Sequence, residues 1–166
     1  MTNLFTIGYE GASLADFLLR LKVAGVDVVV DVRELPLSRR RGFSKNQLAD
    51  ALERCGIGYV HKRELGAPRK IRHELRATGD YTTYFQRFNA YLRTQRAALE
   101  RLLDECVGAA VLLCFERDPK ECHRSAVARE LAKLADLEPV HLDVEERRGS
   151  IREATGMRPG QGAAAT

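Results

Sequence analysis

The sequence predicts an α/β fold, a three-layer, Rossmann-like single domain built on a mainly parallel sheet of about five strands. Apolar runs alternate with amphipathic helical patterns along most of the 166 residues, as expected when helices cross over between parallel strands. Two runs, residues 26–32 and 109–115, have almost no polar face, which is typical of strands covered by helices on both sides. A chain of this length suits one well-buried core.

The first predicted βαβ unit indicates the α/β fold class. Residues 4–8 form the first predicted strand, and Ser13 with Asp16 begins an amphipathic helix that Gly25 ends. Residues 26–32 form the second strand. A strand, a helix and a second apolar strand in this order require parallel strands and a right-handed crossover.

The middle of the chain is more irregular. Residues 33–43 form a loop with three successive arginines, and Ser44 with Gln47 predicts a capping box at the start of the next helix. A short third strand covers residues 57–61. Residues 64–80 then form a basic flap containing a short predicted helix over residues 71–77.

The last third returns to regular elements. Residues 81–106 form one long predicted helix whose aromatic and leucine residues recur at helical spacing. The fourth strand covers residues 109–115, a further helix follows, and residues 139–144 form the fifth strand. The predicted domain therefore spans residues 1–148. Residues 149–166 are polar and Gly-rich, and we expect them to form a disordered tail.

Composition indicates a soluble cytoplasmic protein that does not enter a membrane. No apolar run approaches the ~20 residues of a membrane span, and no basic-then-apolar leader opens the sequence. The four cysteines are irregularly spaced within apolar or helical patterns, unlike a disulfide framework. We expect reduced thiols.

Positive charge is concentrated in one segment. The net charge is +4, but residues 35–76 hold 11 Lys/Arg against 4 Asp/Glu, a net of +7. Such a segment favours a phosphate-bearing small molecule or a nucleic acid as partner. A solvated face would explain it equally well.

Reactive side chains crowd the segment after the predicted strand 109–115. Asp118 and Pro119 match the N-cap and first position of a helix. Three residues would then lie near that helix N-terminus: Cys122, His123 and Arg124. Unpaired N–H groups and partial positive charge there suit an anion or a thiolate.

Other strands also end in residues able to do chemistry. In open parallel sheets, ligands bind beyond the carboxyl ends of the strands, so we expect these residues to share one cleft. The catalytic candidates are Asp31, Glu116, Cys122 and His123. The candidates for holding substrate or phosphate are Tyr9, Arg33, Arg39, Arg40, Arg41, His61 and Arg124.

Several motifs occur in a characteristic order: residues 6–11, 31–33 with Pro36 and Ser38, 42–44, 56–57 with Tyr59 and His61, 65–66, 114–116 and 122–124. On these motifs the chain resembles domain-of-unknown-function family 488 (DUF488) over roughly residues 4–144. The resemblance implies the fold and the site. It does not imply a reaction.

Three functions fit these residues. In an enzyme acting on a nucleotide or nucleic acid, the arginines would hold phosphate, and Glu116, His123 or His61 would move protons. A cysteine-dependent enzyme would use Cys122 as nucleophile. A non-catalytic nucleic-acid-binding module would use the basic segment 35–76 alone.

No cofactor or metal is predicted. Walker and dinucleotide-binding glycine loops are absent from the sequence. Cys114, Cys122 and His123 are potential metal ligands, but we expect adjacent Cys and His residues on a helix to point away from a common ion.

Overall fold

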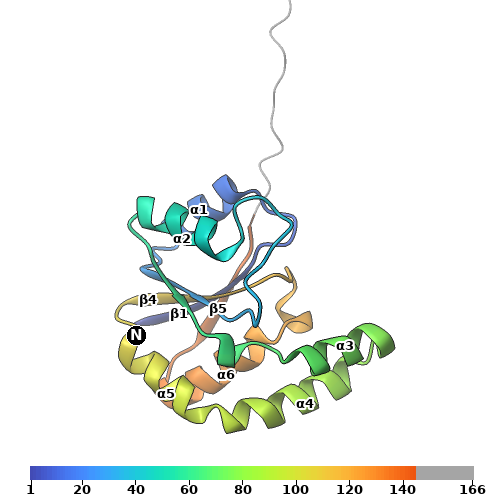
Figure 1. Ribbon diagram of the computed structural model, residues 1–166. Helices are drawn as coiled ribbons and strands as arrows, with labels where there is room; N and C mark the ends of the chain where they lie inside the picture. The colour runs from blue at the N-terminus through green and yellow to red at the C-terminus, as the bar shows by residue number, and fades with distance from the viewer. Residues whose placement is uncertain (145–166) are drawn as a thin grey trace, which may run out of the picture.

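A parallel sheet forms the centre of the computed structural model, which describes residues 1–144. Within these residues five strands lie in the order β3-β2-β4-β1-β5, and every neighbouring pair is parallel (Figure 1). The strands are β1 (Asn3–Gly8), β2 (Val28–Asp31), β3 (Gly58–His61), β4 (Ala109–Cys114) and β5 (Pro139–Leu142). The predicted α/β class is confirmed.

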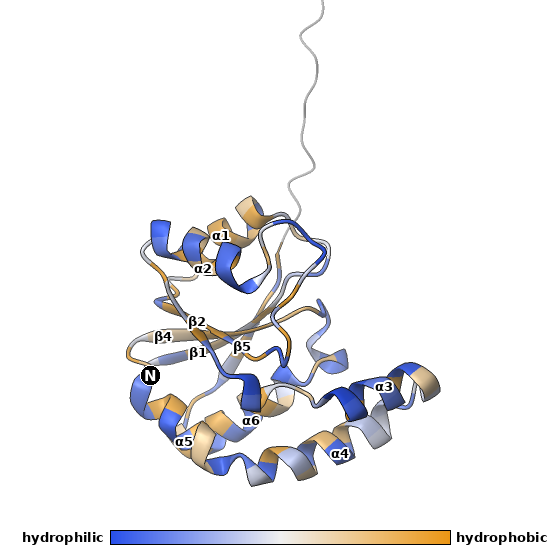
Figure 2. Ribbon diagram, viewed as in Figure 1, coloured by the Kyte–Doolittle hydropathy of each residue, from blue (hydrophilic) through white to orange (hydrophobic). Residues whose placement is uncertain are grey.

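Helices cover both faces of the sheet and complete three layers (Figure 1). One face carries α1 (Leu14–Val23) and α2 (Lys45–Arg54). The other carries α4 (Tyr81–Thr94), α5 (Arg96–Glu105) and α6 (Arg124–Ala135), with α3 (Arg69–Thr78) packed on α4. Orange and blue residues lie side by side along these helices, as expected of amphipathic segments (Figure 2).

Strand β4 separates two apolar cores. All six of its residues are buried. Val111 and Leu113 pack toward α1 and α2, whereas Ala110 and Leu112 pack toward α4, α5 and α6. Successive side chains of a strand point to opposite faces, so an uninterrupted apolar run supplies both cores.

The predicted helix over residues 81–106 is two helices. The α-helical run stops at Thr94 and restarts at Arg96, with Gln95 at φ −101° and ψ 16°. The Thr94 hydroxyl donates to the Tyr91 carbonyl oxygen at 2.6 Å and accepts from Nε2 of the Gln95 side chain at 3.0 Å. Side chains that bond locally in this way compete with the helical hydrogen-bond pattern. In the flap, α3 is longer than predicted and ends at Gly79 in the left-handed conformation.

The predicted capping box at Ser44 does not form, although α2 begins where expected. Ser44 Oγ accepts from the Ser38 amide and donates to the Ser38 carbonyl oxygen. The Gln47 side chain instead accepts from the Gly42 amide. Both side chains therefore hold in place the preceding loop, residues 33–43, which we call the arginine loop.

Within residues 1–144, none of the helices combines the length and apolar character needed to cross a bilayer. The predicted tail, residues 149–166, lies outside the described residues, and so do residues 145–148 of the predicted domain.

Candidate functional site

The carboxyl ends of the strands open onto a cleft of about 900 Å³. The parallel register places His61 beside Asp31, Asp31 beside Leu113, and Gly8 beside Cys114. The loops that follow β1, β2 and β4 therefore leave the sheet at one edge. Residues of these loops line the cleft together with α3 and the start of α4.

Of the eleven predicted site residues, six line this cleft: Tyr9, Arg33, Arg39, Arg40, Glu116 and His123. The remaining five lie outside its lining: Asp31, Arg41, His61, Cys122 and Arg124. The hydrogen bonds and burial of these five residues explain why most of them do not line the cleft.

Asp31 and Arg33 form a buried ion pair at the end of β2. Arg33 donates from Nε to Asp31 Oδ1 at 2.8 Å and from Nη2 to Oδ2 at 2.6 Å. The Tyr59 hydroxyl donates to Asp31 Oδ2 at 2.6 Å. Burial alone would lower the pKa of Arg33, but the Asp31 carboxylate raises it. Both oxygens of the Asp31 carboxylate are occupied by these partners, and Asp31 lies outside the cleft lining.

Arg33 also braces the loop that follows β1. Its Nη1 donates to the Tyr9 hydroxyl at 3.0 Å and to the Phe43 carbonyl oxygen at 2.8 Å. The Tyr9 ring stacks on Phe43, with centroids 4.4 Å apart and planes 7° apart. Since most of its donors are occupied in this way, Arg33 acts mainly as a support for the cleft wall.

The three successive arginines of the loop after β2 differ in whether internal hydrogen bonds already occupy their side chains. The guanidinium of Arg40 donates to the carbonyl oxygens of Gly11 and Ala12. Within residues 1–144, no hydrogen bond or ion pair holds the exposed side chain of Arg39. Arg41 is exposed and does not line the cleft.

Helix α3 adds two arginines that the sequence did not single out. Arg72 and Arg76 lie one helical turn apart and both line the cleft. Arg72 pairs with Glu34. Arg76 is exposed and, among the described residues, has no ion-pair partner. Their i,i+4 spacing, which places both on one face of a helix, was the sequence signal that could have identified them as site residues.

Three side chains form the floor of the cleft: Cys114, Glu116 and His123. The Cys114 thiol donates to Glu116 Oε2 at 3.0 Å, and its sulfur lies 3.7 Å from His123 Nδ1. Burial alone would raise the pKa of Glu116, but hydrogen bonds from the Cys114 thiol and the backbone, together with the His123 ring, lower it. Glu116 is therefore ionised at neutral pH.

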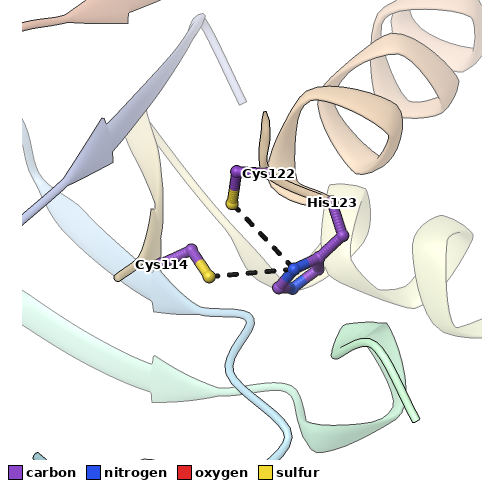
Figure 3. A group of neighbouring side chains, drawn as sticks. All are labelled: Cys114, Cys122 and His123. Carbon is purple, nitrogen blue, oxygen red and sulfur yellow. Dashed lines mark hydrogen bonds between the residues drawn. The ribbon is translucent and has the colours of Figure 1, made fainter. Parts of the chain in front are cut away.

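Cys122 lies behind this floor. Its side chain is fully buried, and its sulfur is 3.9 Å from His123 Nδ1 (Figure 3). Burial and the neighbouring Cys114 raise the pKa of Cys122. A protonated, inaccessible thiol is a poor nucleophile.

The expectation that Cys122 and His123 point apart is wrong. The predicted helix start at Asp118 is a 3-10 turn, Pro119–Glu121, and α6 begins only at Arg124. Cys122 is extended, at φ −128° and ψ 135°, and His123 is the N-cap residue. Because the two residues precede the helix, both side chains face Cys114 (Figure 3).

Arg124 is fully buried and holds the loop that carries Glu116. It donates to the backbone carbonyl oxygens of Glu116 and Arg117 and, from Nε at 3.3 Å, to Thr6 Oγ1. It is therefore a positioning residue. His61 Nε2 lies 2.8 Å from the Arg33 carbonyl oxygen, which fixes the turn after β2 from outside the cleft.

A family model for domain of unknown function DUF488 matches residues 13–131. The chain belongs to the DUF488 family. This confirms the resemblance inferred from the motifs. The matched stretch of this DUF488 protein includes the arginine loop, α3 and the floor of the cleft. Searches of curated proteins and of solved structures found no match.

Proposed function

We propose that this DUF488 protein is an enzyme that acts on a phosphate-bearing small molecule of nucleotide size, with Glu116 as general base. One observation carries the proposal: unpaired arginines and an ionised carboxylate line the same cleft of about 900 Å³. This volume lies at the upper end of the range for small-molecule sites, ~300–1,000 Å³.

Arg39 and Arg76 are the proposed phosphate ligands. Their guanidinium groups approach the cleft from the loop after β2 and from α3, respectively. A guanidinium group offers paired donors that match phosphate oxygens, and neither side chain has an internal partner among residues 1–144. Binding would therefore break no ion pair of the folded protein.

Aromatic side chains support a planar group on the ligand. Tyr81 and Phe115 line the cleft and remain 39% and 44% exposed. Exposed rings beside unpaired arginines suit a nucleobase linked to phosphate, because a base stacks on an aromatic face. A simple sugar phosphate would leave these rings uncovered.

Glu116 is the best-placed proton acceptor. Of the other cleft carboxylates, Glu34 pairs with Arg72 and Glu10 accepts from the Arg117 amide. His123 is less suitable, because Nε2 contacts the Val32 carbonyl oxygen and Nδ1 faces the two thiols. Glu116 would remove a proton from water or a substrate hydroxyl group.

The basic segment 35–76 offers less support for a nucleic-acid-binding module. Lys45 and Arg54 lie on α2, whereas Arg69 and Arg76 lie on α3 (Figure 1). These helices are on opposite sides of the sheet. The positive charge of the two helices is therefore divided between opposite sides of the sheet.

Calorimetric titration with nucleoside monophosphates and single-stranded oligonucleotides tests the binding part. The double variant Arg39→Glu/Arg76→Glu should lower mononucleotide affinity at least tenfold, whereas Arg101→Glu, a single charge reversal on α5 away from the cleft, should leave it unchanged. Binding of oligonucleotides without binding of mononucleotides would favour the nucleic-acid-binding module.

The catalytic part is tested on the nucleotides that bind, with products separated by chromatography. Glu116→Gln keeps the shape of the side chain and should reduce turnover by about 10²–10⁴-fold while retaining binding. Full turnover in this variant would exclude Glu116 as the base.

A further inference from the structure

Two thiols and one imidazole meet at the floor of the cleft. Each of Cys114, Cys122 and His123 offers one ligand atom, and these atoms all lie within 4.8 Å of one another (Figure 3). The two sulfurs are 3.7 Å and 3.9 Å from His123 Nδ1. The residues come from β4 and from the turn before α6, so tertiary structure brings them together.

These separations are close to those that a shared zinc ion imposes. Zn–S bonds of about 2.3 Å and Zn–N bonds of about 2.0–2.1 Å in tetrahedral geometry place sulfur and nitrogen ligands about 3.6 Å apart. Small side-chain rotations would therefore suffice to close the site around an ion.

The imidazole is already oriented as a ligand. His123 Nε2 lies 2.7 Å from the Val32 carbonyl oxygen, a contact that requires the proton on Nε2. Nδ1 then faces the two sulfurs, and in the neutral ring it offers them its lone pair. The edge-to-face contact with Phe88, at 5.3 Å between ring centroids, also holds the ring. Metal-ligating histidines almost always donate the N–H of their other ring nitrogen to a nearby carboxylate, carbonyl oxygen or water in this way.

We propose that Cys114, Cys122 and His123 bind one zinc ion whose fourth position faces the cleft. Two cysteines and one histidine with an open position form a ligand set known from catalytic zinc sites. Cys114 and His123 line the cleft, while Cys122 closes the site from behind. Glu116, whose Oε2 is 3.0 Å from the Cys114 sulfur, is next to the open position.

The inference is independent of the substrate proposed above, because it rests on ligand atoms alone. If both hold, the ion would act as a Lewis acid at the floor where Glu116 accepts a proton. Apolar packing of two thiols would not require an imidazole nitrogen within about 4 Å of both sulfurs.

Metal binding by the full chain, purified under reducing conditions, tests the proposal. Elemental analysis should give about one zinc per chain, and cobalt in place of zinc should give thiolate-to-cobalt charge-transfer absorption. Cys122→Ser should lower zinc affinity at least 100-fold. Cys106→Ser removes a buried thiol from the core against α5 and should bind zinc as the wild type does.

Cys114→Ser is a second ligand variant, in case Cys122→Ser does not fold. Zinc binding that is absent from the wild type, or equal in wild type and ligand variants, would overturn the proposal. So would a disulfide between Cys114 and Cys122 that resists mild reductant. Arg39→Glu/Arg76→Glu should retain zinc, so loss of anion binding and loss of metal binding can be told apart.

Discussion

Replacement of Gly8 by alanine should displace the loop that carries Glu116. Gly8 ends β1 directly opposite Cys114. A Cβ atom at this position would lie 1.8 Å from the Glu116 carbonyl oxygen, 2.6 Å from its carbonyl carbon and 3.0 Å from the Arg117 Cα. The atoms in conflict are backbone, so a side-chain rotation cannot relieve the clash.

The size of the effect follows from these distances. Ordinary contact begins near 3.4 Å, so the Glu116 peptide would have to move by about 1.5 Å. Overpacking of this kind costs about 1–3 kcal/mol, and we expect the upper half of that range because a hydrogen bond from Arg124 also holds the Glu116 carbonyl oxygen. A shift of about 1 Å in a catalytic group reduces turnover by about 10²-fold.

Urea unfolding followed by circular dichroism measures the stability change. Gly58→Ala is the matched control, because the nearest atom to its Cβ would be Val28 Cγ2 at 3.4 Å. We expect the control to change the free energy of unfolding by no more than about 0.5 kcal/mol. Equal midpoints for Gly8→Ala and Gly58→Ala would refute this account of the close approach between β1 and the Glu116 loop.

Two further predictions concern residues outside the cleft. Asp31→Asn leaves Arg33 buried without its counter-charge and should lower the free energy of unfolding by about 3–5 kcal/mol. Tyr59→Phe removes only the hydroxyl that donates to Asp31 and should cost about 1–2 kcal/mol. A loss for Asp31→Asn no larger than that for Tyr59→Phe would contradict the assigned role of the ion pair. Burial and the charge of Arg124 lower the pKa of His141 below its ordinary 6.5. The folded state thus disfavours the protonated ring, and the contribution of His141 to stability should fall as pH drops below about 6.5. His141→Gln should flatten this part of the profile, and an unchanged slope in urea midpoints between pH 7 and pH 5 would contradict the assignment.

The sequence predicted the layers of the fold because β4 is an uninterrupted apolar run and β2 is apolar up to Asp31 at its end. It did not predict that β4 lies between β1 and β2. Strand order depends on pairings between distant segments, which periodicity does not encode. The division of the predicted helix at Gln95 depended on local side-chain hydrogen bonds, and these are also invisible to the apolar pattern.

The site was predictable in outline for a similar reason. Glu116 and His123 follow strand β4 and reach the cleft, as the topology requires. Asp31 and Arg124 look equally reactive in the sequence, but internal partners occupy both side chains. Arg76 was missed as a site residue because only the packing of α3 on α4 brings it to the cleft.

Two-dimensional NMR of the full chain, titrated with a nucleoside monophosphate, tests the central claim most directly. We predict shifts for the Nε–H signals of Arg39 and Arg76 and for the Glu116 amide, with the α2 residues Lys45 and Arg54 unaffected. Absence of shifts at saturating ligand, or shifts confined to α2, would contradict a phosphate-binding cleft at the carboxyl ends of the strands.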